Sequence, residues 1–384
     1  MIALLLALAC GGREAPRHLI VLCVDDLRAD ALGTYAVDAR ETPNLDAFLA
    51  SAVAYPTVLS PTSGRRPGVA TLMTGLRPHR HGLGVESQDL SSRVTSLAQV
   101  LSPAFFETAA VLGVVPDEGA GLYRGFDVVS HGDERRPATE VTDTALAWLD
   151  EQVMGGRDPD RLFLWVEYAD LLPPRNRPAG DVRRYNFAVG VMDDEIRRFL
   201  ERFDASPLSR DAAVVLISPR GSTSALHAAR VDGAGELLDD ITRVPFAIRV
   251  PTGRSGQIAG LVGTEDVMPT LLDLMGIGVG PIDGRSMWGR VVQPRDVVVA
   301  EASVAGADAK RPSWINSDRW QMARSNRHKL LWDPLSGDME LYDLVTDSNE
   351  LWNALDDSPE RTGLARPLLD AILQRRREAE PQTL

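Results

Sequence analysis

Five short stretches of the chain are almost wholly apolar, and they alternate with stretches in which apolar residues recur every three or four positions. The apolar stretches are rich in β-branched and aliphatic residues, which is typical of strands buried on both faces of a parallel sheet. They span residues 18–24, 108–114, 161–168, 212–218 and 245–250. The pattern predicts a doubly wound α/β fold whose functional groups follow the carboxyl ends of these strands.

Two stretches show clear helical periodicity. In the first, Thr42 stands where a helix cap is expected, Pro43 fits the first turn, and residues 45–52 carry an apolar stripe. In the second, apolar residues recur at spacings of three and four from Tyr185 to Phe203. This spacing predicts a long amphipathic helix packed on the sheet.

The last quarter of the chain has a different pattern. Residues 328–344 read as two strands around the turn Ser336-Gly337-Asp338, and residues 366–380 read as a final helix. We therefore expect a tether over residues 1–16, a large α/β domain over 17–292, and a smaller α+β subdomain over 293–384.

Composition narrows the functional classes. The 384 residues include 41 basic and 54 acidic side chains, for a formal net charge of −13. A nucleic-acid-binding protein needs a basic surface to neutralise phosphates, so this balance argues against nucleic acid as a partner. No stretch after residue 10 is apolar and long enough to span a bilayer.

The N-terminus suggests export. Eight apolar residues follow Met1, and Cys10 comes next with Gly-Gly behind it, as in a short secretory signal that ends in a bacterial lipoprotein box. Lipidation of Cys10 would hold the protein at a membrane in the cell envelope, facing the periplasm or the exterior. A wrongly assigned start codon or an unstructured tail, with a cytoplasmic location, is the alternative. Cys23 lies inside a predicted strand and is expected to be a small core residue.

Two adjacent carboxylates, Asp25 and Asp26, follow the first predicted strand. Such a pair repels itself and favours a hard divalent cation such as Ca²⁺ or Mg²⁺. A solvated turn is the alternative when the pair is considered alone.

Eight further segments together resemble the sulfatase family of the alkaline phosphatase superfamily. In chain order they read VDDLRADALGTY, TPNLDAFLASAVAY, TLMTGLRPHRHG, YNFAVGVMDDEIRRFL, VPFAIRVP, EDVMPTLLDLMGI, DGRSM and ELYDLVTDSNELWNAL. The resemblance runs from residue 17 to about residue 356. It implies an alkaline-phosphatase-like α/β fold, a smaller C-terminal domain, and sulfate-ester hydrolysis at a Ca²⁺ site by a modified Cys or Ser.

The resemblance also shows where this chain departs from the family. With the signature aligned on its proline and its closing Thr-Gly pair, the nucleophile position is Arg65, the signature Ser is Gly68 and the signature Arg is Val69. A guanidinium stays protonated and offers no lone pair, so Arg65 cannot be a nucleophile. Ser63 and Thr62 are the nearby hydroxyls that a shifted alignment would offer instead.

Other catalytic positions differ as well. Where the family has metal-binding Asp and His or Asn, this chain has Pro219 and Arg220, and Leu171 and Leu172 stand where a His is frequent. Residues 109–125 contain neither the Lys nor the His usual there. We therefore expect no bound cofactor, or Ca²⁺ if Asp25 and Asp26 still hold a metal.

Three arginines bear on the charge of this region. Arg65, Arg66 and Arg220 are either surface charges or an anion-binding group at the old active site. Because two buried carboxylates need a positive partner, we expect Arg65 or Arg220 within ion-pair reach of Asp25 or Asp26, as a bidentate pair.

Three functions remain open from the sequence. The first is a catalytically degenerate homologue that binds or scaffolds in the cell envelope, the second an active sulfate- or phosphate-ester hydrolase with an unconventional nucleophile, and the third a sensor of sulfated or phosphorylated ligands. The candidate partners are therefore a sulfated or phosphorylated ligand and a protein of the cell envelope. His79 and His81 are interpreted as structural turn residues, and His227 as an exposed loop residue.

Overall fold

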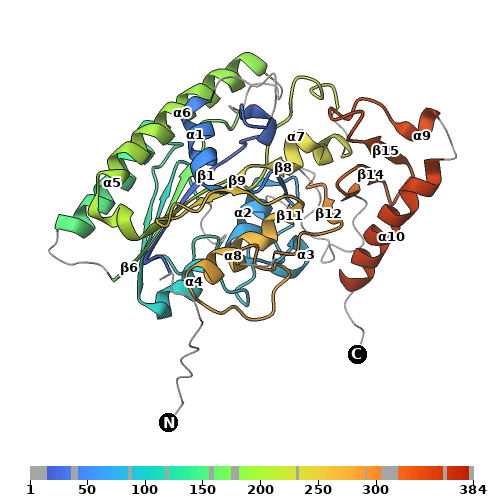
Figure 1. Ribbon diagram of the computed structural model, residues 1–384. Helices are drawn as coiled ribbons and strands as arrows, with labels where there is room; N and C mark the ends of the chain where they lie inside the picture. Colours follow the sequence, from blue (N-terminus) through green and yellow to red (C-terminus); the bar gives the residue numbers. More distant parts are fainter. Residues whose placement is uncertain are drawn as a thin grey trace, which may run out of the picture.

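The computed structural model describes residues 15–35, 42–84, 89–116, 121–154, 160–173, 181–230, 233–289, 292–303, 319–357 and 361–379. They form a large α/β unit with helices on both faces of a central sheet, and a smaller unit at one end (Figure 1). The expected fold class is confirmed. Cys10, its proposed lipidation and most of the tether lie outside the described residues.

The central sheet has eight strands in the order β10-β2-β9-β7-β1-β6-β4-β5. Strands β7, β1, β6, β4 and β5 run parallel. The eight strands are β1 His18–Val24, β2 Val53–Ala54, β4 Phe106–Leu112, β5 Val128–Ser130, β6 Arg161–Tyr168, β7 Ala212–Ile217, β9 Phe246–Arg249 and β10 Gly256–Gln257. Strand β1 lies between β6 and β7, so its carboxyl end is at the centre of the sheet edge.

One strand runs against the expected direction. Residues 245–250 were predicted as another parallel strand, but β9 pairs antiparallel with both β7 and β2. Periodicity reports that a strand is buried and not which way it runs, because direction is decided by the preceding connection. The large sheet is therefore mixed at this side and parallel at its centre.

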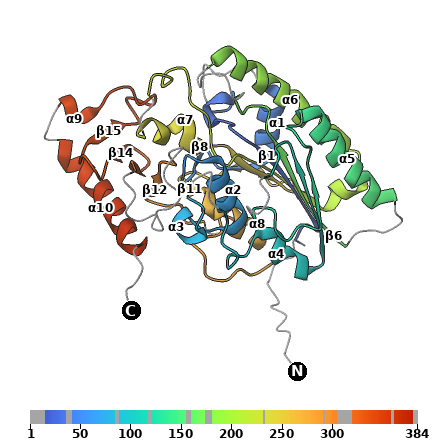
Figure 2. The same cartoon turned by 180° about the vertical axis from the view of Figure 1, so that it is seen from behind.

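Helices cover both faces of the sheet (Figures 1 and 2). On one face, apolar side chains of α1, α5 and α6 pack on Ile20 and Leu22 of β1, and on the other, those of α2, α4 and α8 pack on Leu19 and Val21. The helices are α1 Pro43–Ser51, α2 Arg65–Thr74, α3 Pro78–His81, α4 Leu97–Leu101, α5 Ala138–Met154, α6 Val182–Asp204, α7 Asp239–Thr242, α8 Val267–Leu274, α9 Ala354–Asp357 and α10 Thr362–Ala379. Short 3-10 turns span Ala29–Ala31, Ser102–Ala104, Pro207–Asp211, Gly235–Leu237 and Thr264–Asp266. The described α6 contains the predicted amphipathic helix.

Two smaller sheets complete the architecture. A three-stranded sheet has the order β11-β3-β8, and the four-stranded antiparallel sheet β12-β13-β14-β15 lies in the C-terminal region. Their strands are β3 Thr57–Leu59, β8 Arg243–Val244, β11 Leu261–Gly263, β12 Val298–Glu301, β13 Gln321–Arg324, β14 His328–Trp332 and β15 Met339–Asp343. The predicted hairpin is confirmed by the antiparallel pairing of β14 with β15, and its turn uses Gly337 at a φ of 80°. We call β12–β15 with α9 and α10 the C-terminal subdomain.

The final helix begins earlier than expected. Helix α10 starts at Thr362, so Pro367 lies inside the helix and not at its start. Among the described residues, none forms a helix with both the length and the apolar character needed to cross a membrane.

The free backbone N–H groups at the start of α1 find their acceptor in a distant residue and not in the predicted cap, Thr42. Thr42 makes no capping hydrogen bond, and its hydroxyl donates to Asp46 at 3.1 Å. The free N–H of Leu45 donates to Asp193 Oδ1 at 2.8 Å, and the Asn44 side chain donates to Asp193 Oδ2 at 2.7 Å. Asp193 belongs to α6 and is buried. A carboxylate at a helix N-terminus also meets the positive end of the helix dipole, so Asp193 fixes α1 against α6.

We predict that Asp193→Ala lowers the free energy of unfolding by about 1–3 kcal/mol, because it leaves buried N–H donors of α1 without an acceptor. Urea denaturation at pH 7 measures this. Asp194→Ala is the matched control, since the Asp194 side chain is 72% exposed and its loss should change stability by less than about 0.5 kcal/mol. Equal losses in the two variants would contradict the capping role.

Candidate functional site

The two adjacent carboxylates sit in a tight turn at the end of β1. The Asp25 N–H donates to the Tyr168 carbonyl at 2.9 Å, which extends the pairing of β1 with β6 by one residue. Asp26 then adopts a left-handed conformation with a φ of 60°, a strained choice for any residue but less so for Asp. The Tyr185 hydroxyl of α6 donates to the Asp26 carbonyl at 3.0 Å. The turn points both carboxylates inward, where they are fully buried.

Arg65 is the first residue of α2, and its guanidinium reaches two acids. Its Nε donates to Asp25 Oδ2 and its Nη2 donates to Oε1 of Glu167. The other oxygen of Glu167 accepts from the Tyr123 hydroxyl at 2.8 Å and from the Trp165 indole at 3.0 Å. Glu167 is thus held by three donors although it is fully buried in strand β6.

Sequence reasoning missed Glu167. It stands near the end of the apolar run RLFLWVEY, one residue before the strand ends. A charged residue inside such a run is a signal that could have been followed, because acids are almost never fully buried unless they are paired.

Arg220 supplies the second positive charge. Its Nε donates to Asp26 Oδ1 at 2.9 Å, and its Nη1 donates to the Ser63 carbonyl at 2.9 Å. The expected ion-pair reach is therefore confirmed for both arginines. The expected bidentate geometry is wrong, because Arg65 divides its nitrogens between two acids and Arg220 between an acid and a backbone carbonyl. We call Asp25, Asp26, Arg65, Glu167 and Arg220 the carboxyl-edge cluster.

Arg66 does not belong to this cluster. Its guanidinium contacts Asp89 at 3.5 Å. Successive residues of an α-helix point about 100° apart, so Arg65 and Arg66 cannot face the same site at the start of α2. The contact with Asp89 separates Arg66 from Arg65 and Arg220, and its part in an anion-binding group stays a prediction.

The carboxyl-edge cluster carries three acids and two bases, so it has one excess negative charge when every group is ionised. Burial raises the pKa of Asp25 to about 8, the charges of Glu167 and Asp26 act in the same direction, and Arg65 opposes them. Desolvation lowers the pKa of Arg65, but Asp25 and Glu167 outweigh it and raise that pKa well above its ordinary value. The cluster therefore favours a charged Arg65 guanidinium and a proton on Asp25 near neutral pH.

The residues at this position do not fit a calcium ion. Ca²⁺ takes six to eight oxygen ligands, but Pro219 offers no side-chain oxygen and Arg65 and Arg220 present positive charge to Asp25 and Asp26. In the described part of the chain, no group of three or more His, Cys, Asp or Glu is arranged to hold a metal. Of the carboxylate oxygens in the carboxyl-edge cluster, only Asp25 Oδ1 and Asp26 Oδ2 accept no hydrogen bond from the described residues. Two oxygens beside two guanidiniums do not make a cation site.

The alternative nucleophiles are both engaged in the loop before α2. The Ser63 hydroxyl donates to Glu236 Oε2 at 2.6 Å and accepts from the Ser303 N–H at 2.6 Å. The Thr62 hydroxyl accepts from the Gly64 N–H at 3.3 Å. Both residues are buried, and their contacts join the loop to the C-terminal subdomain.

The histidines divide into two cases. His81 is buried, accepts from the Leu83 N–H at 3.1 Å and lies 3.2 Å from the Thr71 hydroxyl, and burial lowers its pKa to about 3. Its predicted structural role is confirmed, and His79 lies partly buried on the same short helix α3. His227, expected to be exposed, is 5% exposed, because the C-terminal subdomain covers it.

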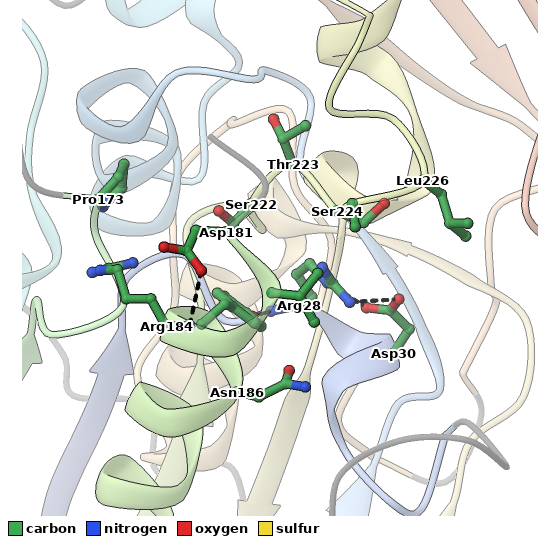
Figure 3. Close-up of a pocket in the computed structure, with 13 residues that line it drawn as sticks. Arg28, Asp30, Pro173, Asp181, Arg184, Asn186, Ser222, Thr223, Ser224 and Leu226 are labelled. Atoms are coloured by element: carbon green, nitrogen blue, oxygen red, sulfur yellow. Dashed lines mark hydrogen bonds and ion pairs between the residues drawn. The ribbon is translucent and has the colours of Figure 1, made fainter. Parts of the chain in front are cut away.

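A small cavity of about 170 Å³ lies beside the cluster, at the same edge of the sheet (Figure 3). It is lined by Arg28 and Asp30 after β1, Pro173 after β6, residues 181, 182 and 184–186 at the start of α6, and residues 222–226 after β7. Arg28 is bonded to Asp30 at 2.7 and 3.0 Å and lies over the Tyr185 ring at 4.8 Å. Two arginines and two aspartates line the cavity, so its wall has no net charge. A larger cavity of about 740 Å³ lies at the opposite, amino-terminal edge of β1, away from the cluster.

Comparison with known proteins identifies the fold's relatives. The family model described as Sulfatase matches residues 17–277. The uncharacterized sulfatase YidJ of Escherichia coli (strain K12) is 30% identical over 211 residues, which are 52% of this chain and 39% of that protein. The ulvan-active sulfatase of Formosa agariphila is 23% identical over 351 residues, covering 75% of this chain and 67% of that protein. The matched segment therefore spans well under half of the E. coli protein.

A solved structure resembles nearly the whole chain. The structure of BT4656, in complex with its substrate D-glucosamine-2-N,6-O-disulfate, has a TM-score of 0.75 at 14% identity and covers 96% of this chain and 99% of that chain. At this identity the likeness concerns the fold.

We predict that Arg65→Ala lowers the free energy of unfolding by about 3–5 kcal/mol at pH 7, because it leaves buried Asp25 and Glu167 without their shared cation. Arg202→Ala is the control, since that side chain is 62% exposed and exposed pairs contribute about 0–1 kcal/mol. Denaturant unfolding of the two variants gives the comparison. A loss in Arg65→Ala no larger than that in the control would show that the cluster does not need the guanidinium.

Proposed function

Because the chain belongs to the sulfatase family, we propose that it is a catalytically degenerate sulfatase homologue that binds or scaffolds in the cell envelope. The observation that carries the proposal is the pairing of Arg65 with both Asp25 and Glu167. By the family resemblance, Arg65 stands at the nucleophile position and Asp25 at the metal site. A fixed, protonated guanidinium then takes the place of both the attacking group and the cation.

The packing around α2 supports the same proposal. A side chain on Gly68, where the family signature has Ser, would place its Cβ 2.6 Å from the Pro219 carbonyl oxygen. Pro219 itself stands where the resemblance places a metal-binding Asp. The helix and the loop after β7 therefore fill the space between these two positions with their own backbone, so restoring one family residue would displace the other segment.

An unconventional nucleophile is less well supported. Ser63 is the better placed of the two hydroxyls, but it already donates to Glu236 and accepts from Ser303. An anion sensor built on the arginines is also less well supported, since a sulfate or phosphate would have to displace the carboxylates that Arg65 and Arg220 already bind.

The envelope location rests on the N-terminal sequence. Residues 2–9 are apolar and Cys10 precedes Gly-Gly, while the described chain begins at Ala15, only three residues before β1. A lipid on Cys10 would thus hold the α/β domain close to a membrane.

We predict no hydrolysis of 4-nitrophenyl sulfate or 4-nitrophenyl phosphate above the buffer background with Ca²⁺, Mg²⁺ or Mn²⁺ present, because Arg65 offers no lone pair for attack. Absorbance of released 4-nitrophenol measures turnover in the wild type and in Ser63→Ala. Equal background rates in both proteins support the proposal. Metal-dependent turnover that Ser63→Ala abolishes would overturn it in favour of an active hydrolase.

We also predict that the protein carries lipid on Cys10 when it is expressed in a bacterium with its complete N-terminus. Intact-mass measurement and membrane fractionation of the wild type and Cys10→Ala provide the test, with Cys23→Ala as the control because that thiol is buried in β1. We expect membrane association to be lost only in Cys10→Ala. Unchanged mass processing and fractionation in Cys10→Ala would exclude the anchor.

A further inference from the structure

His227 lies in the loop after β7, between two parts of the molecule. Its Nδ1 is 2.9 Å from Asp240 Oδ2 in α7, and its Nε2 is 2.9 Å from the carbonyl oxygen of Asn349. Asn349 follows β15 in the C-terminal subdomain. The imidazole therefore spans the joint between the large domain and the subdomain, with 5% of its surface exposed.

The two nearest groups that face the ring are acceptors, and the Ser224 hydroxyl, 3.4 Å from Nδ1, is a more distant third neighbour that can donate or accept. A carbonyl oxygen cannot donate, and an ionised carboxylate accepts only, so each ring nitrogen needs its own hydrogen to make these two contacts. A neutral imidazole carries one N–H and the imidazolium carries two. The Asp240 oxygen that His227 contacts also accepts from the Ser224 N–H at 2.7 Å, so it acts as an acceptor toward both neighbours. The geometry thus selects the charged histidine.

Each element that packs on this joint contributes charged side chains near the His227 ring. Asp240 of α7 lies within electrostatic reach of Arg28 after β1. On the subdomain side, Glu350 pairs with Lys329 of β14 at 2.7 Å. Asp239 of α7 pairs with Lys329 at 2.8 Å and with Arg324 of β13 at 3.1 Å. Arg28 is itself bonded to Asp30, so a charged His227 supplies the positive charge in direct contact with Asp240.

We infer that His227 is a proton-controlled tie that holds the cavity-lining loop after β7 to the C-terminal subdomain. The loop residues 222–226 form one wall of the 170 Å³ cavity, and His227 follows them directly. When the ring loses a proton, it keeps one N–H and can hold Asp240 or Asn349 but not both. The loop then loses one of its contacts, while the N–H bonds of Ser222 and Ser224 to Asp240 and the Arg230–Glu340 pair remain. This inference does not depend on whether the chain hydrolyses esters.

The direction of the pH effect follows from the contacts. Desolvation lowers the pKa of His227, but the hydrogen bond and charge of Asp240, the Asn349 carbonyl and the charge of Glu350 outweigh it and raise that pKa. The stabilisation from the tie is therefore complete below the unperturbed value of about 6.5. It is lost as the pH rises through the raised value. Burial also raises the pKa of Glu350, to about 7. The titration of His227 must therefore be separated from that of Glu350, and a variant that changes His227 but keeps Glu350 does this.

Ring-nitrogen NMR of the ¹⁵N-histidine-labelled full chain tests the protonation directly. We expect both ring nitrogens of His227 to be protonated at pH 6.5 and to lose a proton only above that pH. A His227 ring that is neutral and in one tautomer at pH 6.5 would overturn the inference. The titration is measured on the wild type. His227→Gln serves only to identify which signal belongs to His227.

Amide hydrogen exchange between pH 6 and pH 9, corrected for the intrinsic pH dependence, tests the tie. We expect protection of residues 222–230 in the wild type to fall about tenfold as His227 loses its proton, since one charge-assisted hydrogen bond is lost. In His227→Gln, which keeps Glu350, protection should be low and independent of pH, and His131→Gln should behave as the wild type. The tie is refuted if protection in the wild type does not change with pH, or if it falls equally in His227→Gln. If His227→Gln does not fold, the wild-type titration and exchange profiles decide.

Discussion

A carboxylate that is taken out of water costs several kcal/mol unless another positive group replaces its lost hydration. At the carboxyl edge of the central sheet, Asp25, Asp26 and Glu167 are all fully buried. Arg65 and Arg220 reach them from α2 and from the loop after β7. The position of α2, the conformation of the β1 turn and the closure of the sheet edge all depend on this pairing.

The residues at this edge depend on one another. Gly68 leaves room for the Pro219 backbone, and Pro219 in turn brings Arg220 beside Asp26. Arg65 donates to both Asp25 and Glu167, so one guanidinium compensates two buried carboxylates. Residues from four separate segments, after β1, in α2, in β6 and after β7, therefore form one unit of mutually paired charges. This arrangement does not fit a cation site.

The same principle joins the C-terminal subdomain to the rest of the molecule. Lys329 of β14 is fully buried and pairs with Asp239 of α7 and with Glu350. Apolar side chains from both parts, among them Leu238 and Met322, pack around this joint. A buried ammonium with two acids is costly to separate, so the small sheet is part of the folded unit that shapes the site. Its loops also reach the edge of the site through Ser303 and Asn349.

The alternation of apolar runs and amphipathic stretches determined the sheet, the long helix and the hairpin, because burial of one face is a local property of a strand or helix. The meeting of Arg220 with Asp26 was also predictable, since β1 and β7 are parallel and their carboxyl ends share one sheet edge. Arg65 was placed there by the family resemblance, since it follows β3 of the three-stranded sheet. Only the tertiary structure decided the reversed direction of β9 and the capping of α1 by Asp193, 148 residues from the Leu45 N–H that it accepts. It likewise decided that Glu167 joins the carboxyl-edge cluster and that His227 is buried. Each of these depends on a partner that is distant in the chain, and a pattern of period two or 3.6 contains no information about which distant residue will supply the opposite charge or the missing acceptor.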